Sequence, residues 1–216
     1  MTAAKRGQFD VVPTLRRPAP QLGRRARDTI ARILDATRTV FLAQGYGGTS
    51  IDDIARSAGI SRASFYTYFP TKRDALLALG ADATNGAERL IEQLGELGSQ
   101  PNVSDIGAWV DDYFAFLDDY GSFVLAWQQA AYEDDELRAA GTKHHLVTCR
   151  RMGDQLDASR GRRRGDATSQ GLLVFSMLER AWSQCRLYEG ALDGAKVRAN
   201  AALVIAALLA DGASDR

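Results

Sequence analysis

The chain has 216 residues, of which 45% are hydrophobic and 25% charged, and this composition excludes a disordered or fibrous protein. Its formal net charge is zero, yet residues 1–73 carry 13 Lys and Arg against 5 Asp and Glu, a net charge of +8, which leaves −8 on the remainder. A basic segment joined to an acidic one predicts that one end of the chain meets a polyanion while the other has a different task.

The sequence has no segment that we expect to enter or cross a membrane. The longest mostly apolar stretch, residues 199–210, is shorter than the roughly 20 residues of a membrane span. The basic N-terminus has no apolar run of signal-peptide length beside it, so we expect the protein in the cytoplasm. Cys149 and Cys185 lack a CxxC or similar spacing, which predicts two thiols rather than a disulfide or a zinc site.

Residues 1–23 hold three prolines and little apolar periodicity, which predicts a flexible basic arm. The arginines in and just after this arm could enter a minor groove of DNA, or they could add only nonspecific electrostatic attraction. These arginines are Arg16, Arg17, Arg24, Arg25 and Arg27.

A helical pattern begins directly after the arm. It predicts a first helix of about five turns, with Gly45 as its C-terminal stop. The residues that carry the period are Ile30, Ile33, Leu34, Thr37, Val40 and Phe41.

Two short helices follow. Thr49 or Ser50 can cap the second helix, and Gly59 ends it. Ser61 can cap a third helix that runs to about Tyr68. Two short helices joined by a tight, glycine-containing turn predict a helix-turn-helix.

The pattern in the rest of the chain predicts helices separated by residues that interrupt a helix. Pro70 interrupts the chain, and Thr71 can cap a long helix over about 72–97. No alternating strand of useful length occurs, so we predict an all-α fold with a helix-turn-helix domain at 24–70 and a helical body at 71–216. The further helices are expected at about 104–119, 121–132, 134–160, 167–189 and 193–210.

The stretch TSIDDIARSAGISRASFYTYFPTKRDALL, Thr49–Leu77, resembles the N-terminal signature of the TetR family of bacterial regulators. That signature has a Thr at the start of the second helix, an Ala-Gly-apolar-Ser turn, spaced aromatic residues and a Lys soon after. All occur in this chain, with Phe65, Tyr66, Tyr68 and Phe69 as the aromatic residues. The match covers roughly residues 27–77, whereas the body agrees only in its helical plan and length. The resemblance implies a dimeric transcriptional regulator whose body binds a small ligand.

The geometry of the third helix gives these residues separate tasks. At about 100° per residue, Phe65 and Phe69 lie on one side and Ala63 and Thr67 on the other, which leaves the second side free to enter a major groove. Arg62 can offer two parallel N–H bonds to a guanine edge. A solvated side chain or an ion pair is the alternative for Arg62.

Other polar groups nearby can donate hydrogen bonds to phosphate oxygens. Such contacts position the protein on DNA but do not distinguish one base sequence from another. For the tyrosines the alternative is ordinary packing at the surface of a small domain. The predicted contacts to double-stranded DNA are Arg27, Thr49, Ser61, Arg62, Ala63, Ser64, Tyr66, Thr67, Tyr68 and Lys72.

One recognition helix covers too few bases to find a single site in a genome, so we expect a symmetric pair on half-sites about one helical turn, roughly 34–36 Å, apart. The resemblance implies a homodimer through the last two helices, 167–189 and 193–210. A core helix within a monomer is the alternative. The apolar residues expected to support close packing in the last helix are Ala199, Ala201, Ala202, Leu203, Ile205, Ala206, Ala207, Leu208 and Leu209.

The body is dense in aromatic residues. Trp109, Tyr113 and Phe116 can share a helix face and line a cavity for a small apolar ligand, although a solid core is the alternative. The run Trp109–Gly121 also resembles the mycobacterial ethionamide-resistance branch of the family, which places His145 near the ligand. The same resemblance implies that Cys149, Phe175, Leu178, Glu179 and Trp182 also lie near the ligand, whereas a structural role is the alternative for each. The expected ligand-binding residues are Trp109, Tyr113, Phe116, Trp127, Cys149, Phe175, Leu178, Glu179 and Trp182.

Such a ligand would release a repressor from a palindromic operator by favouring a conformation with misplaced recognition helices. The alternative is a DNA-binding regulator or architectural protein with no small-molecule effector. Carboxylate pairs occur at residues 111–112 and 118–119, but no Glu-x-x-His, nucleophile elbow or phosphate loop accompanies them. We therefore expect no catalytic residue, no metal site and no cofactor.

Overall fold

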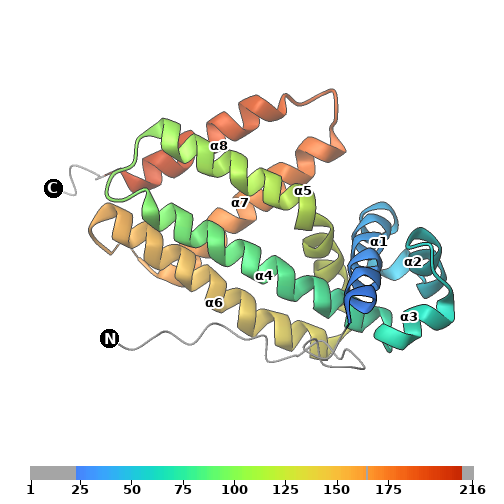
Figure 1. The fold of residues 1–216 in the computed structure, drawn as a ribbon. Helices are drawn as coiled ribbons and strands as arrows, with labels where there is room; N and C mark the ends of the chain where they lie inside the picture. Colours follow the sequence, from blue (N-terminus) through green and yellow to red (C-terminus); the bar gives the residue numbers. More distant parts are fainter. Residues whose placement is uncertain (1–22, 164, 211–216) are drawn as a thin grey trace. The chain divides into compact units, whose positions relative to one another are not determined.

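The structure is a computed structural model that describes residues 23–163 and 165–210. Within these ranges the chain forms eight α-helices and no strand, and the all-α prediction is confirmed (Figure 1). The predicted arm, residues 1–23, lies outside the described residues except for its last position. The helices are α1 (Arg24–Gly48), α2 (Ile51–Ser57), α3 (Arg62–Tyr68), α4 (Lys72–Glu96), α5 (Val103–Glu133), α6 (Asp135–Arg160), α7 (Ala167–Leu187) and α8 (Gly194–Leu209).

The helices contribute to two compact units. Within the described residues, the first unit comprises 23–84 and 119–144, and the second comprises 85–118, 145–163 and 165–210. The three helices α4, α5 and α6 each supply residues to both units, whereas α7 and α8 belong to the second alone. No helix in the described part of the chain is both long enough and apolar enough to span a bilayer.

Short polar signals set the ends of the first three helices. Gly45 takes the left-handed conformation (φ 69°) and interrupts α1, as its sequence position predicts. Ser50 and Asp53 form a reciprocal capping box at the start of α2. Gly59 (φ 64°) ends the turn between α2 and α3, and Ser61 caps α3. These signals produce the helix-turn-helix that the sequence predicts.

The predicted break near Gly121 is wrong, because α5 continues through it as one helix of 31 residues. A glycine inside a helix costs only about 1 kcal/mol relative to alanine. That cost is offset because Leu117, Ala126 and Ala130, on either side of Gly121, are all at most 1% exposed. The helix ends instead before Asp134, whose Oδ1 accepts hydrogen bonds from two amides at the start of α6.

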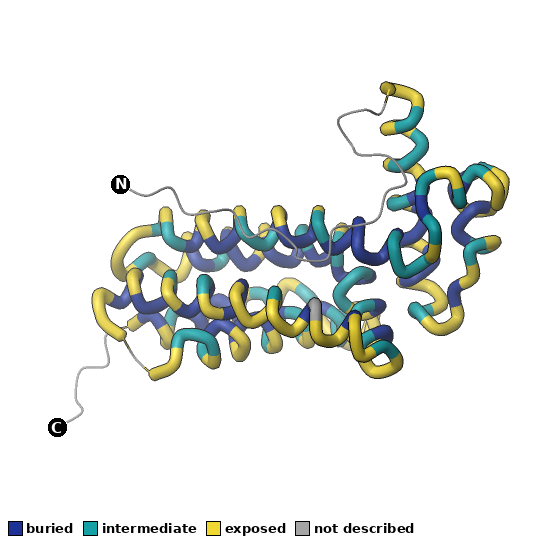
Figure 2. The backbone as a smooth tube through the Cα atoms, turned by 90° about the horizontal axis from the view of Figure 1, so that it is seen from below, coloured by how far each residue is buried: buried dark blue, intermediate teal, exposed yellow. Residues whose placement is uncertain are grey.

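Each unit has its own core, and buried and exposed residues alternate along the long helices (Figure 2). In the second unit, α6 and α7 cross with their backbones almost in contact. A Cβ added at Gly171 would lie 1.8 Å from the carbonyl oxygen of Cys149. A Cβ added at Gly153 would lie 1.8 Å from the carbonyl oxygen of Ala167. Only glycine at these two positions permits this crossing.

Candidate functional site

Helix α3 has one buried side and one exposed side. Phe65 and Phe69 are 0% exposed and pack in the core of the first unit. Ala63 and Thr67 are exposed, and the Thr67 hydroxyl donates to the Ala63 carbonyl at 3.1 Å. The cap residue Ser61 is exposed as well. The predicted division of α3 into a core side and a free side is confirmed.

Arg62 connects α3 to α2. Its Nη1 lies 2.8 Å from Oδ2 of Asp52, and its Nη2 donates to the Tyr66 hydroxyl at 3.2 Å. The hydrogen bond to Tyr66 and the charge of Asp52 raise the pKa of the guanidinium. The side chain is still 58% exposed. Arg62 is therefore in an ion pair in the free protein, at the end of α3 that we expect to approach DNA first.

The tyrosines and Ser64 lie at the border of the free side. Tyr66 and Tyr68 are half-buried, and both rings pack against the core of the first unit. The Tyr66 ring meets Phe65 edge-on, with centroids 6.0 Å apart. Packing therefore accounts for both rings. Their predicted hydroxyl contacts to phosphate remain predictions.

Thr49 and Lys72 already have partners within the protein. Thr49 is 3% exposed, and its hydroxyl donates to the Gly45 carbonyl at 2.7 Å. The Lys72 ammonium donates to the carbonyls of Tyr46 at 2.6 Å and Thr49 at 2.8 Å, and it lies over the Tyr46 ring. Either residue would have to exchange a carbonyl oxygen for a phosphate oxygen to contact DNA as predicted.

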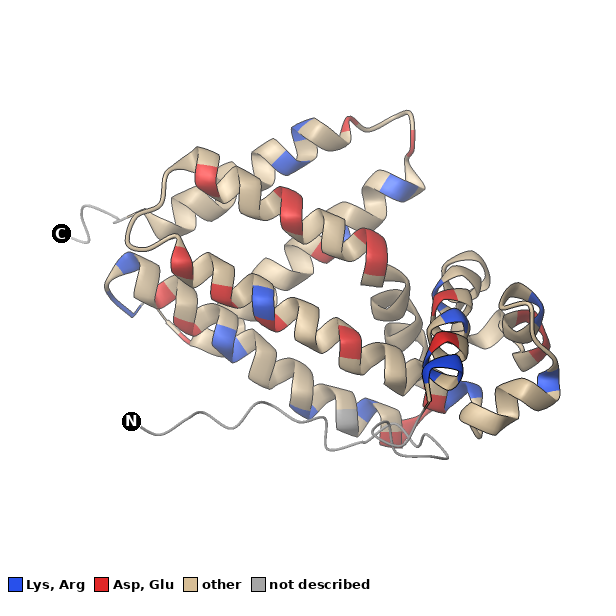
Figure 3. Cartoon of the chain, viewed as in Figure 1, with Lys and Arg blue, Asp and Glu red and all other residues tan. Residues whose placement is uncertain are grey.

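Basic side chains are concentrated on the first helices of the unit. Arg24, Arg25 and Arg27 are exposed in the first turn of α1, and Arg56 is exposed on α2 (Figure 3). Acidic residues accompany them, because Arg56 lies 3.0 Å from Asp53. The surface around α3 thus carries both positive and negative side chains, and several of its arginines have an acidic partner.

Three contacts that the sequence did not suggest join α1 and the start of α4 to α5, α6 and the residue between them, within the first unit. The Tyr46 amide donates to Oε1 of Gln129 at 2.8 Å. Arg73 lies 3.3 Å from Asp134 and 3.1 Å from Glu136. Sequence spacing could not reveal these contacts, since each joins residues at least 60 positions apart.

Most of the residues expected to bind a ligand gather in the core of the second unit. Tyr113 is at its centre, with ring centroids 5.6 Å from Trp109, 5.8 Å from Phe116 and 6.0 Å from Phe175. Cys149, Leu178 and Trp182 belong to the same core, each at most 3% exposed. Trp127 is placed in the first unit, where it packs on Gly141.

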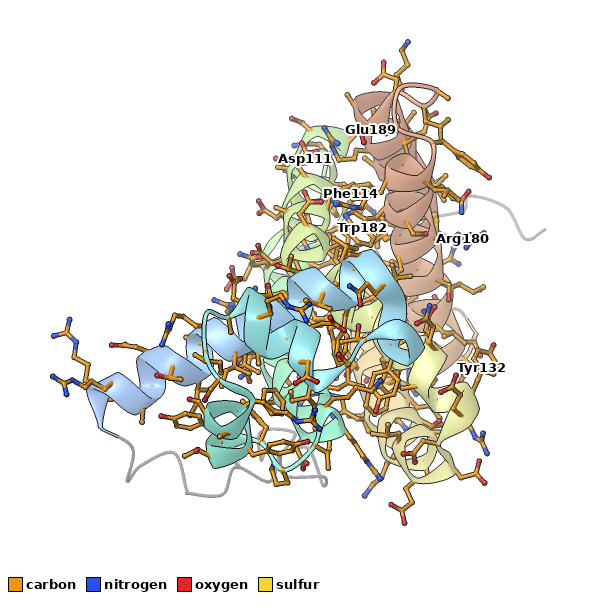
Figure 4. The ribbon with its side chains drawn as sticks, turned by 90° about the vertical axis from the view of Figure 1, so that its right-hand side faces the viewer. Asp111, Phe114, Tyr132, Arg180, Trp182 and Glu189 are labelled. Carbon is orange, nitrogen blue, oxygen red and sulfur yellow. The ribbon has the colours of Figure 1, made fainter. Side chains whose placement is uncertain are left out.

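The polar atoms of the two core tryptophans have partners. Trp109 Nε1 donates to the Leu90 carbonyl at 2.8 Å, and Trp182 Nε1 donates to Asp118 at 2.9 Å. Figure 4 shows Trp182 on α7 near Phe114 of α5. The acidic pair at 118–119 thus serves partly as a structural contact between α5 and α7, which sequence reasoning missed.

Three titratable groups of this core are strongly perturbed. Burial and the nearby Glu179 raise the pKa of the Cys149 thiol to about 11, so this thiol stays protonated at neutral pH. Burial raises the pKa of the half-buried Glu179 carboxyl to about 7. Tyr113 is 2% exposed, and burial followed by the Glu179 charge holds its pKa well above the ordinary value.

Helices α7 and α8 and their connection carry both buried and exposed apolar side chains. On α8, Ala201, Ala202, Ile205 and Leu209 pack inside the chain, so these members of the predicted dimer set are core residues. Others stay accessible together with side chains of α7 and of the α7–α8 connection. This surface, the α7–α8 face, consists of Leu172, Leu173, Leu187, Tyr188, Leu192, Leu203, Val204 and Leu208, which are 38–69% exposed.

Residues 33–79 match the family described as bacterial regulatory proteins, tetR family. A relative, the HTH-type transcriptional regulator EthR of Mycobacterium tuberculosis, is 36% identical over 73 residues, which cover 34% of this chain and 33% of that regulator. The chain therefore aligns with only about a third of this curated relative.

Solved structures extend the likeness to the body. A putative transcriptional regulator from Saccharomonospora viridis in complex with choline is 18% identical, with a TM-score of 0.66 over 83% of this chain and 96% of that one. FadR from Bacillus subtilis in complex with stearoyl-CoA is also 18% identical, with a TM-score of 0.62 over 81% and 96%. These two share the fold. The family match and the EthR relative identify residues 33–79, the helix-turn-helix region, as that of the TetR family of bacterial regulatory proteins.

Proposed function

We propose that this protein is a DNA-binding transcriptional regulator, a repressor that binds a palindromic operator as a homodimer and is released by a small ligand with a largely apolar body. The observation that carries this proposal is the two-sided geometry of α3. Two fully buried phenylalanines fix the helix, and exposed Ala63 and Thr67 lie on its opposite side. A helix held in this way can enter a major groove without unfolding the unit that carries it.

Arg62 is the residue that we propose recognises the base sequence of the operator. On DNA its guanidinium would leave Asp52 and donate two parallel hydrogen bonds to a guanine. In the free protein, the ion pair with Asp52 would keep the guanidinium ordered. The methyl groups of Ala63 and Thr67 suit the methyl group of thymine.

The α7–α8 face supports the homodimer. Eight large exposed apolar side chains on α7, α8 and the connection between them leave more apolar surface in water than isolated exposed leucines do. Burial of such a surface against a second copy stabilises the pair by about 25 cal/mol for each Å² of apolar area removed from water. A two-fold axis through this face would present two copies of α3 to two half-sites.

Release by a ligand requires a connection between the core of the second unit and α1–α3, and the long helices supply it. Helix α5 carries Tyr113 in the second unit and Gln129, the partner of the Tyr46 amide, in the first. A ligand that prefers a shifted α5 would therefore also bias the position of α1. The free energy available for release is the difference in the affinity of the ligand for the two conformations.

Selection of bound sequences from random duplex DNA tests this proposal. We expect the wild type to enrich a palindrome, and Arg62→Ala to relax one position in each half-site by roughly ten- to a hundredfold in affinity. Arg89→Ala is the matched control, because Arg89 is an exposed arginine on the part of α4 that belongs to the second unit. Failure of the folded protein to enrich any sequence would overturn the proposal.

A further inference from the structure

Two polar groups in the aromatic core of the second unit lack partners in the protein. Among the described residues, neither the Tyr113 hydroxyl nor the Glu179 carboxylate takes part in a hydrogen bond or an ion pair. Tyr113 is 98% buried, since only 2% of its surface is exposed. A hydroxyl on a nearly buried ring and a half-buried carboxylate are usually satisfied, so each of these groups can accept a partner from water or from a ligand.

The two groups are close to each other although they belong to different helices. Tyr113 is on α5 and Glu179 on α7, yet the Glu179 charge raises the pKa of Tyr113 and also that of Cys149 on α6. Three helices thus bring one carboxylate, one hydroxyl and one thiol together. Neither Tyr113 nor Cys149 carries a positive charge, so neither can compensate an ionised Glu179.

Aromatic rings surround this polar group. Phe175 lies one helical turn before Glu179 on α7, and its ring is 6.0 Å from the Tyr113 ring. Trp182 lies three residues after Glu179 and is 3% exposed. Aromatic faces attract cations through their quadrupole, and they do so most strongly where water is excluded.

We propose that the ligand of this core is an organic cation with an apolar body, whose ammonium group binds Glu179 and the Tyr113 hydroxyl among the rings of Phe175 and Trp182. This inference deepens the proposed function and rests on it for the location of the effector site. It names the chemical class of the effector. Trp109 and Phe116, which stack on Tyr113, would contact the apolar part of such a ligand.

Other ligand classes fit these groups less well. An anionic head group would place a second negative charge beside Glu179. A ligand without any polar group would cover the carboxylate and the hydroxyl without offering either of them a partner, which carries a desolvation cost. A cation satisfies both groups at once, because an ammonium attracts the carboxylate and the hydroxyl oxygen can face the positive charge.

Binding of a cation has a pH signature that separates it from binding of a neutral molecule. Glu179 has a pKa of about 7 without ligand, so it is roughly one tenth ionised at pH 6 and nine tenths at pH 8. A cation binds the ionised form, so its affinity should rise about tenfold over this range. Tyr113 and Cys149 stay neutral throughout, because both pKa values are raised.

Other charged groups near this core define the controls for pH. Nε2 of His145, an ionisable side chain, lies 3.5 Å from the Cys149 sulfur. Asp118, which accepts from Trp182, is 3.5 Å from Arg186 and is exposed. The pH dependence should therefore persist in His145→Gln and in Asp118→Asn, and it should vanish in Glu179→Gln.

Three probes of similar size test the ligand class on the full-length protein. They are benzyltrimethylammonium, its neutral carbon analogue neopentylbenzene, and the anion 4-phenylbutyrate. Quenching of tryptophan fluorescence reports binding, because Trp109 and Trp182 are in this core. We expect benzyltrimethylammonium to bind best, and Glu179→Gln to weaken it at least tenfold at pH 8 without changing the affinity for neopentylbenzene. Glu189→Gln, an exposed glutamate after α7, should bind all three as the wild type does.

Several results would overturn the inference: no binding of the cation, equal or tighter binding of the neutral or anionic probe, or an unchanged affinity for the cation in Glu179→Gln. These binding measurements need no DNA, so they are independent of the proposed function. The same cation is then added to the complex with the selected operator. A cation that binds through Glu179 but leaves that complex intact would support the ligand class and contradict release by this site.

Discussion

The crossing of α6 and α7 makes Gly171→Ala a demanding test of the packing around the proposed effector site. The new Cβ would lie 1.8 Å from the carbonyl oxygen of Cys149, 2.7 Å from its carbonyl carbon and 3.0 Å from its Cα. Ordinary contact begins near 3.4 Å. The two helices would have to separate by about 1.5 Å, because the atoms in contact are backbone atoms that cannot rotate away.

The free energy of unfolding should fall accordingly. Overpacking in a core typically costs about 1–3 kcal/mol, and a clash with backbone belongs at the upper end of that range. Replacing glycine by alanine within a helix returns up to about 1 kcal/mol. We therefore expect a net loss of roughly 2 kcal/mol, which corresponds to a decrease in Tm of roughly 4–8 °C for a chain of this size.

Gly107→Ala is the matched control, because Gly107 is also within a helix of the second unit and a Cβ there would have nothing within 4 Å. It should be neutral or stabilising by up to about 1 kcal/mol. Urea unfolding followed by far-UV circular dichroism at one fixed protein concentration measures both variants. If Gly171→Ala were as stable as Gly107→Ala, the backbone contact between α6 and α7 would be refuted.

Three further predictions concern the interface, the DNA-reading helix and the buried carboxyl. Leu173→Glu on the α7–α8 face should yield a folded monomer in sedimentation experiments; a dimer of unchanged affinity would exclude this face. Asp52→Asn should free Arg62 and tighten DNA binding severalfold in anisotropy titrations, whereas weaker binding would give Asp52 a positive role on DNA. Because the folded-state pKa of Glu179 is raised to about 7, its ionisation reduces stability as pH rises from about 4.5 through 7. Glu179→Gln should thus be more stable than the wild type at pH 8, by on the order of 2 kcal/mol, with a difference that disappears only at about pH 4 in urea unfolding.

Local signals in the sequence were sufficient to predict the helix-turn-helix. The caps Ser50 and Ser61 and the stops Gly45 and Gly59 each act within a few residues, so they can be read without knowledge of the fold. The core side of α3 follows from helical periodicity in the same way. Gly121 shows the limit of such reading, because burial on both sides keeps α5 helical through it.

The partners of the candidate site residues could not be predicted in this way. Lys72 satisfies two carbonyls at the end of α1, and Gln129 accepts from the Tyr46 amide, because the fold brings distant segments together. The many aromatic residues of the body favour an apolar ligand. The sequence does not show that Glu179 lies among these residues without a hydrogen-bond partner. The perturbed carboxyl becomes evident only when burial is known.

The affinity for operator DNA relative to scrambled DNA tests the central claim most directly. The duplex recovered by selection and a scrambled duplex of the same length and composition are titrated with the wild-type protein at one physiological salt concentration, with fluorescence anisotropy as the readout. A sequence-specific regulator should bind the selected duplex at least roughly 1,000-fold more tightly, with one dimer or a whole number of dimers per palindrome. Equal affinity for the two duplexes would contradict sequence-specific reading by α3.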